Sequence, residues 1–274
     1  MVCYRHPDRE AYVRCQRCER LICPDCQVES AVGFLCIEDA GKQPPRNRGR
    51  IAATFDGRPL VTQVLLVVTV AIYALQILSG GLLTDYLSFN PYFATFQPWR
   101  FITTGFVHSD LLLSNPTSVL HLVLNMYTLY LFGQALEPML GRWRFLALYL
   151  ISILGGSIAV MWLASTDTWV VGASGGAFGL MAAYLVVLRS IGANSNSMVG
   201  VIAINLVFSF ISPSISWEAH VGGLALGALV AFLYSKTRDL KKQNFQLLGL
   251  AGIVLALTLA GGIRGILIVA QSMM

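Results

Sequence analysis

The stretches Gly172-Ala173-Ser174-Gly175 and Ala219-His220-Val221-Gly222-Gly223 lie at the starts of two apolar segments with the composition of membrane-spanning helices. A serine and an imidazole inside hydrocarbon are costly, so their presence there needs a reason. Together the two side chains supply a nucleophile and a base, which is the minimum for acyl transfer. The two stretches therefore indicate both where the chain resides and what chemistry it performs.

The composition excludes an ordinary soluble domain, because 55% of the 274 residues are hydrophobic and only 12% are charged. Hydropathy read in windows of about 19 residues predicts an all-α polytopic membrane protein. Several of the predicted spans are shorter than the ~20 residues of a full crossing, which short helices or a locally thin bilayer would explain. The seven predicted spans are Leu60–Leu78, Leu120–Leu136, Phe145–Leu163, Ser174–Leu188, Val199–Ile211, Ala219–Tyr234 and Phe245–Ile263.

Lysine and arginine fall on alternate loops, which predicts a cell-membrane protein with a cytoplasmic N-terminus and a site that opens to the outer side. The residues on the predicted cytoplasmic side are Arg46, Arg48, Arg50, Arg58, Arg142, Arg144, Arg189, Lys236, Arg238, Lys241 and Lys242. Basic clusters beside spans are normal at anionic lipid surfaces, so they do not indicate a nucleic-acid partner. Arg100 and Arg264 are basic residues on the predicted outer side. We expect Arg100 to contact lipid headgroups and Arg264 to snorkel.

Residues 1–40 differ from the rest, since they contain all six cysteines of the chain. Pairs of ligands two residues apart suit the small turn that grips one edge of a zinc tetrahedron. Four such pairs provide ligands for two structural zinc ions, which would stabilise a segment too short for a core of its own. The alternative, a disulfide framework, conflicts with a reducing cytoplasm. The predicted ligands are Cys3, His6, Cys15, Cys18, Cys23, Cys26, Cys36 and Asp39.

The order of these ligands resembles the cross-braced B-box zinc fingers. The resemblance pairs Cys3 and His6 with Cys23 and Cys26 at one site, and Cys15 and Cys18 with Cys36 and Asp39 at the other. Asp39 departs from the Cys or His usual at the last position, so a single zinc site is the alternative. A finger of this kind implies a regulatory role with a protein partner. A basic, proline-containing linker follows over residues 41–59.

Ser174 follows a polar stretch at residues 165–168, so it is predicted to lie at a helix N-terminus that water can reach. Free backbone N–H groups at such a terminus favour a developing oxyanion. Phe178 lies one turn further on and can pack against a neighbouring imidazole. Taken alone, G-x-S-G is a weak signal, because small residues also recur where membrane helices pack closely.

His220 shares one helical face with Gly223 and Gly227. This face can press against the glycines that follow Ser174, which would bring the imidazole within reach of the serine hydroxyl. No acidic residue is placed to orient His220, so the sequence predicts a Ser–His dyad. The alternative for a single membrane histidine is a hydrogen bond that only joins two helices.

His121 and Asn125 are spaced i, i+4 on the second predicted span and share a face. Both side chains can donate hydrogen bonds, and an Asn amide is a common oxyanion donor. The alternative is that they only join neighbouring helices.

The three motifs around His121, Ser174 and His220, in their order along the chain, resemble the signatures of the rhomboid intramembrane serine proteases. Trp99-Arg100 and Glu137-x3-Gly141-Arg142 resemble further segments of the same family. The resemblance implies a six-helix core over residues 60–235, with a cytoplasmic loop and a seventh helix at 236–274. It implies cleavage of single-span membrane proteins within the lipid bilayer, without a metal in the reaction. The implied roles are nucleophile and base for Ser174 and His220, oxyanion donors for His121, Asn125 and the Ser174 N–H, and support for Gly172, Phe178 and Gly223.

Three other functions are weighed against the protease. A catalytically silent relative that binds membrane helices would be expected to lack Ser174 or His220, and both are present. A metal-sensing receptor would have the finger as its working part. A transporter would be expected to show inverted halves and charges at the membrane midplane, which we do not find in the sequence.

Overall fold

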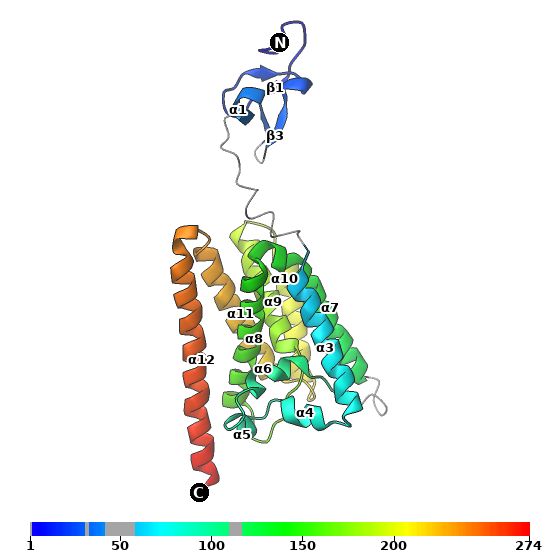
Figure 1. Ribbon diagram of the computed structural model, residues 1–274, viewed down its shortest axis with the longest axis vertical. Coiled ribbons are helices and arrows are strands. Elements are labelled where there is room, and N and C mark those ends of the chain that lie inside the picture. Colours follow the sequence, from blue (N-terminus) through cyan, green and yellow to red (C-terminus); the bar gives the residue numbers. More distant parts are fainter. Residues whose placement is uncertain (1, 31–32, 42–57, 110–116) are drawn as a thin grey trace. The chain divides into compact units, whose positions relative to one another are not determined.

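The computed structural model describes residues 2–30, 33–41, 58–109 and 117–274. The chain divides into two compact units, Met1–Asp56 and Gly57–Met274 (Figure 1). Arg46, Arg48 and Arg50 of the predicted basic linker lie outside the described residues.

The N-terminal unit is built from two small antiparallel hairpins and one short helix (Figure 1). Its core consists of the cysteines themselves, packed with a few apolar side chains such as Ile22 and Leu35. A unit with so little apolar core depends on other cross-links for stability. The elements are β1 (Val13–Arg14), β2 (Leu21–Ile22), the 3-10 helix η1 (Pro24–Cys26), β3 (Val28–Ser30), β4 (Gly33–Leu35) and α1 (Ile37–Gly41).

The second unit is all-α and has the fold expected of a polytopic membrane protein. By length and composition, five of its described helices can cross a membrane, and two shorter apolar helices accompany them. The five are α3 (Leu60–Leu78), α7 (Thr117–Leu140), α8 (Arg142–Leu163), α11 (Trp217–Lys236) and α12 (Gln243–Ser272). The shorter two are α9 (Ser174–Ser190) and α10 (Asn196–Ile211), and all seven predicted spans are therefore helices.

The predicted bounds match at α3 but are too tight elsewhere, most of all at α12, which has 30 residues. Hydropathy windows leave out polar residues at helix ends, whereas α8 and α12 already begin at Arg142 and Gln243. The break between α7 and α8 comes at Gly141, whose φ of 88° is a conformation that L side chains rarely adopt. Short helices also explain two of the short spans, because α9 and α10 have 17 and 16 residues.

The centre of the second unit is formed by α8, α9 and α11 (Figure 1). Its buried side chains include Phe145, Tyr149 and Leu180. α12 lies at the edge of the bundle, and its few buried residues, such as Gly261 and Ile268, face α8 and the loop after α3. The predicted nucleophile Ser174 and base His220 therefore lie on two of these three central helices, α9 and α11.

Residues 79–109, which follow α3, form a compact structure at one end of the bundle (Figure 1). Its elements are α4 (Leu82–Leu87), α5 (Pro91–Ala94), α6 (Arg100–Thr103) and the 3-10 helix η2 (Thr104–Phe106). Phe89 pairs with Val170 through an isolated β-bridge, which ties this segment to the chain just before Ser174.

Arg100 does not reach toward lipid headgroups as expected. Its side chain is 4% exposed and donates hydrogen bonds to the backbone carbonyls of Asp85 and Ser88 and to the Gln97 side chain. Burial lowers the pKa of its guanidinium. The three acceptors hold the loop together from inside, a role that a five-donor guanidinium is suited to fill.

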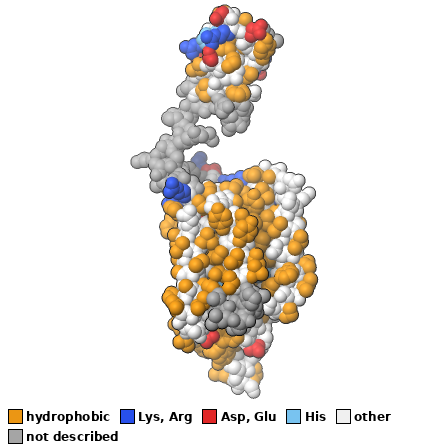
Figure 2. Space-filling model, turned by 90° about the vertical axis from the view of Figure 1, so that its right-hand side faces the viewer, with side chains coloured by type: hydrophobic (Ala, Val, Ile, Leu, Met, Phe, Trp, Pro, Cys, Tyr) orange, Lys and Arg blue, Asp and Glu red, His pale blue; other side chains and the backbone are white. Residues whose placement is uncertain are grey.

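Hydrophobic side chains cover the face of the helical unit that Figure 2 shows, and its visible Lys and Arg side chains lie at one end. The start of α8, the end of α11 and the start of α12 lie together, because Arg144 donates to the Gln246 side chain and Tyr234 donates to the Arg144 carbonyl. Arg264 lies away from the basic end and donates from Nε to the Met161 carbonyl, so it joins α12 to α8 instead of only snorkelling.

Candidate active site

Ser174 is the first residue of α9, and the last residue of that helix, Ser190, accepts a hydrogen bond from Arg238, so Ser174 lies at the end of α9 away from this basic residue. It follows Ala173, which has no side-chain cap, so backbone N–H groups of the first turn remain directed out of the helix. The preceding Gly172 has a φ of +126°, a backbone conformation that favours glycine. A Cβ built on Gly172 would lie 2.9 Å from the His121 ring and 3.8 Å from the Ser174 hydroxyl. The glycine thus allows both side chains to lie beside the same backbone.

His220 lies in the first turn of α11, which begins after the capping residue Ser216. Its ring stacks on Phe178, with ring centroids 4.2 Å apart and planes inclined by 19°. Phe178 is one helical turn beyond Ser174 on α9. The side chain of His220 is 6% exposed, and Nδ1 lies 2.6 Å from the hydroxyl oxygen of Ser209 on α10.

The backbones of α9 and α11 are in direct contact through glycines. A Cβ on Gly223 would overlap the carbonyl of Gly175, and a Cβ on Gly227 would overlap the backbone of Gly179. Only residues without side chains allow two helices to approach this closely. The spacing of Gly223 and Gly227 therefore sets how near His220 comes to the N-terminus of α9.

His121 and Asn125 lie on α7 beside this junction. Asn125 is 6% exposed, and its Nδ2 donates to the His121 carbonyl at 2.9 Å. An amide has two N–H donors, so this bond leaves one for a ligand. His121 has its ring against Gly172, as described above, which brings this predicted donor to the start of α9, and Asn125 lies one helical turn further along α7.

The structure also places His108 beside this site, whereas the sequence predicts only local hydrogen bonds for it. It is fully buried, and its ring lies 5.3 Å from that of His121. Its Nε2 accepts a hydrogen bond from the Ala173 N–H at 3.5 Å, and Gln76 holds its backbone. Burial, with a smaller contribution from His121, lowers the pKa of His108 to about 3. The neutral ring can therefore support the backbone just before Ser174.

Every residue that the sequence placed at this site lies at one end of α7, α9 and α11. The sequence did not single out Ser209 or Gln76. Ser209 lies in an apolar helix where a serine has no obvious packing role, and Gln76 is a polar residue at the end of an apolar span. An isolated polar residue on an apolar helix is the signal that could have found both.

In the N-terminal unit, the predicted metal ligands form two groups whose ligand atoms lie within 4.8 Å of one another. The groups are Cys3, His6, Cys23 and Cys26, and Cys15, Cys18, Cys36 and Asp39. All six cysteines are free, so the disulfide alternative is not what the structure contains. The pairing is the cross-braced one that the B-box resemblance implied, and both ligand sets can hold a metal ion.

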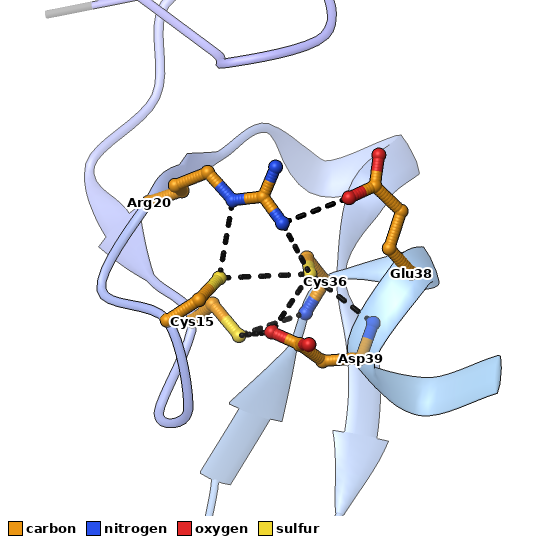
Figure 3. A network of polar contacts seen from close by, with 6 residues as sticks. Cys15, Arg20, Cys36, Glu38 and Asp39 are labelled. Atoms are coloured by element: carbon orange, nitrogen blue, oxygen red, sulfur yellow. Dashed lines mark hydrogen bonds and ion pairs between the residues drawn. The ribbon is translucent and has the colours of Figure 1, made fainter. Parts of the chain in front are cut away.

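Arg20 borders the second of these groups (Figure 3). Its Nε lies 3.2 Å from the Cys18 sulfur, and one terminal nitrogen lies 3.9 Å from the Cys36 sulfur. The same nitrogen donates to Glu38 at 2.8 Å. Since this group holds three thiols and a carboxyl, a neighbouring guanidinium would offset negative charge once the thiols ionise.

Comparison with known proteins decides the family. The family model for the rhomboid domain matches residues 95–237. YdcA of Bacillus subtilis (strain 168) is 36% identical over 146 residues, which cover 52% of this chain and 69% of YdcA. The chain belongs to the rhomboid family. It is thus a multi-pass membrane protein of an intramembrane protease family.

Two further rhomboid relatives are named as proteases. Rhomboid protease GluP of Bacillus subtilis (strain 168) is 30% identical over 204 residues, covering 69% of this chain and 38% of GluP. Rhomboid protease GlpG of Pectobacterium atrosepticum is 29% identical over 191 residues, covering 65% of this chain and 64% of GlpG. The chain spans less than two thirds of the length of these two relatives.

Proposed function

We propose that this rhomboid is an intramembrane serine endopeptidase in which Ser174 is the nucleophile and His220 the general base. The observation that supports this most strongly is the stacking of His220 on Phe178, one turn from Ser174, with ring centroids 4.2 Å apart. Glycine contacts between α9 and α11 fix that approach at the level of the backbone. A nucleophile and a base held by rigid, closely packed helices meet the geometric requirement for covalent catalysis.

In this proposal Ser174 attacks the carbonyl carbon of the scissile peptide bond, and His220 takes the hydroxyl proton. His220 then passes the proton to the leaving amine, and general acid–base catalysis of this kind contributes about 10²–10⁴ in rate. His220 then takes a proton from water, which attacks the acyl carbonyl carbon, and the proton passes to the Ser174 oxygen as the ester bond breaks and the new carboxyl end leaves. No acidic side chain is needed, so the site acts as a dyad.

The oxyanion is held by three donors: the His121 ring, the Asn125 amide and the backbone N–H of Ser174. Support comes from the position of His121 against Gly172 and from the second amide proton of Asn125, which its bond to the His121 carbonyl leaves free. The partial positive charge of the α9 N-terminus acts in the same direction. Gly172, Phe178 and Gly223 support this arrangement.

The substrates we propose are single-span membrane proteins, cut in or beside their transmembrane helix. The basic ends of α8, α11 and α12 favour a cytoplasmic position for that side of the bundle and for the N-terminus. Ser174 lies at the opposite end, so water would reach it from the outer side of the cell membrane. The division into a finger (1–40), a linker (41–59), a protease core (60–235) and a C-terminal loop and helix (236–274) belongs to the same proposal.

We further propose that residues 1–40 bind two structural zinc ions and present a surface to a protein partner. Each of the two ligand groups offers four donor atoms close enough for one tetrahedral ion. The first would have three thiolates and His6, and the second three thiolates and Asp39. Zinc there would supply folding free energy to a unit with little apolar core.

Cleavage of a reconstituted single-span substrate tests the enzymatic proposal. The wild type should release two fragments whose junction lies in or beside the substrate helix, and Ser174→Ala should release none. A Ser174→Ala protein that still binds the substrate would show that the fold survives. A wild type that binds the helix without cutting it would support the catalytically silent alternative.

A further inference from the structure

The ring nitrogen Nδ1 of His220 is in contact with a serine hydroxyl rather than with a carboxylate. The Ser209 oxygen is 2.6 Å from His220 Nδ1, and Ser209 is only 2% exposed. The two residues come from different helices, α10 and α11, and the contact is buried. α10 is otherwise weakly buried, with Met198, Ile202 and Ser209 as its only buried residues.

The position of the hydrogens in this contact determines which ring nitrogen of His220 is protonated. Ser209 Oγ donates its single hydrogen to the Asn205 carbonyl at 2.7 Å, one turn earlier on α10. A serine hydroxyl has one donor and two acceptor positions, so toward His220 it can only accept. When that hydrogen stays on the Asn205 carbonyl, the hydrogen of the 2.6 Å contact resides on Nδ1. A neutral ring protonated at Nδ1 has its lone pair on Nε2.

We propose that Ser209 is the positioning residue of the dyad, which holds His220 in the Nδ1–H tautomer so that Nε2 can accept the Ser174 proton. This rests on the proposed function. Phe178 fixes the plane of the ring by stacking, and Ser209 fixes its rotation and its proton. Two contacts from two helices thus orient a ring that accepts no hydrogen bond from, and donates none to, a carboxylate among the described residues.

The same contact stabilises the charged form of the base during the reaction. When His220 becomes an imidazolium, Nδ1–H donates to Ser209 more strongly, because hydrogen bonds from ionised donors are about twice as strong as neutral ones. A neutral hydroxyl gives this support without placing a carboxylate inside the membrane, where an ionised side chain is costly. The Asn205 carbonyl polarises the hydroxyl further in the same chain of bonds.

Nitrogen-15 spectroscopy of histidine tests the tautomer directly in the full chain. The chain has four histidines, so His→Gln variants assign each resonance. We expect His220 to carry its proton on Nδ1 in the wild type. In Ser209→Ala the Nδ1–H loses its acceptor, and the ring should shift toward the Nε2–H form. An Nε2–H ring in the wild type would overturn the proposal.

Reaction with a fluorophosphonate measures the consequence for the nucleophile. Ser209→Ala should label about tenfold more slowly, the equivalent of one buried hydrogen bond, while its unfolding midpoint stays near the wild-type value. Ser209→Thr keeps the hydroxyl and its bond to the preceding turn, so it should restore both the rate and the tautomer. Ser197→Ala, at an exposed position of the same helix, is the control. Equal labelling rates for Ser209→Ala and the wild type would contradict the proposal.

The two proposals fail in different ways. If the wild type does not label at all but shows the Nδ1–H tautomer, the protease proposal fails and the role of Ser209 on the ring stands. If the wild type labels at Ser174 and Ser209→Ala changes neither tautomer nor rate, only the role of Ser209 fails.

Discussion

The carbonyl of Gly175 occupies the space that a side chain on Gly223 would need. This contact lies between Ser174, one residue before Gly175, and His220, one turn before Gly223. It makes the separation of the two proposed catalytic side chains a property of two backbones in contact. Backbones move far less than long side chains, so this contact would preorganise the proposed dyad.

Gly223→Ala should separate α9 from α11. The added methyl group meets backbone rather than a flexible side chain, so overpacking should cost about 1–3 kcal/mol and lower the rate of cleavage sharply. Gly252→Ala is the matched control, because a Cβ there has nothing within 4 Å. Thermal unfolding in detergent and substrate cleavage measure both effects, and a Gly223→Ala enzyme with full activity would contradict the role of this contact.

Asn125→Ala should slow cleavage about 10²–10³-fold through kcat, with little change in KM, as expected for the loss of one oxyanion donor. The control is Thr128→Ala on the same helix, whose hydroxyl only bonds back to the Leu124 carbonyl. Steady-state kinetics on a reconstituted substrate separates the two constants. A rise in KM at constant kcat would place Asn125 in substrate binding instead.

Much of the fold and the candidate site could be predicted from the sequence. Apolar runs mark all seven helices, because hydrocarbon imposes the same requirement on each, and small residues around Ser174 and His220 predict the close approach of α9 and α11. The paired cysteines likewise predict the two ligand groups, because local turns bring such pairs together.

What the sequence could not provide are contacts between distant polar residues. Arg100 was expected at the lipid surface, yet backbone carbonyls distant from it in sequence surround it. Ser209 is 11 residues from His220, and only the packing of α10 on α11 brings the two together. Such pairs depend on the angle between helices, which residue spacing within one helix does not determine.

Glu137→Ala should destabilise the fold by about 1–3 kcal/mol, because it leaves buried donors without an acceptor. The Glu137 carboxylate accepts from the backbone N–H of Val61 and from both the N–H and the hydroxyl of Thr62, so it caps α3 from α7. Glu137→Gln keeps one acceptor oxygen and should lose less. Unfolding in detergent measures the series, and equal stabilities would show that the cap is dispensable.

The protein should contain two zinc ions per chain by metal analysis. Cys3→Ser and Cys36→Ser should each lose one ion, because they belong to different ligand groups. Disruption of one site should leave the other ion bound. A wild type that retains no zinc after purification in metal-containing buffer would contradict the zinc proposal.

Arg20→Gln should weaken the zinc site of Cys15, Cys18, Cys36 and Asp39 about 10–100-fold, the usual effect of losing a partner outside the ligand shell. Competition with a chromophoric chelator measures the affinity, and the other site should be unaffected. Arg17→Gln is the control, since Arg17 is exposed. Equal affinities for the two variants would remove Arg20 from any role at this site.

The most direct test of the account is fluorophosphonate labelling of the protein, followed by mass spectrometry of the labelled peptide. An activated serine reacts with this reagent whether or not the natural substrate is known. We predict a single adduct on Ser174, which is lost in Ser174→Ala and strongly reduced in His220→Ala. Labelling of equal strength in Ser174→Ala and the wild type would contradict the Ser174–His220 dyad.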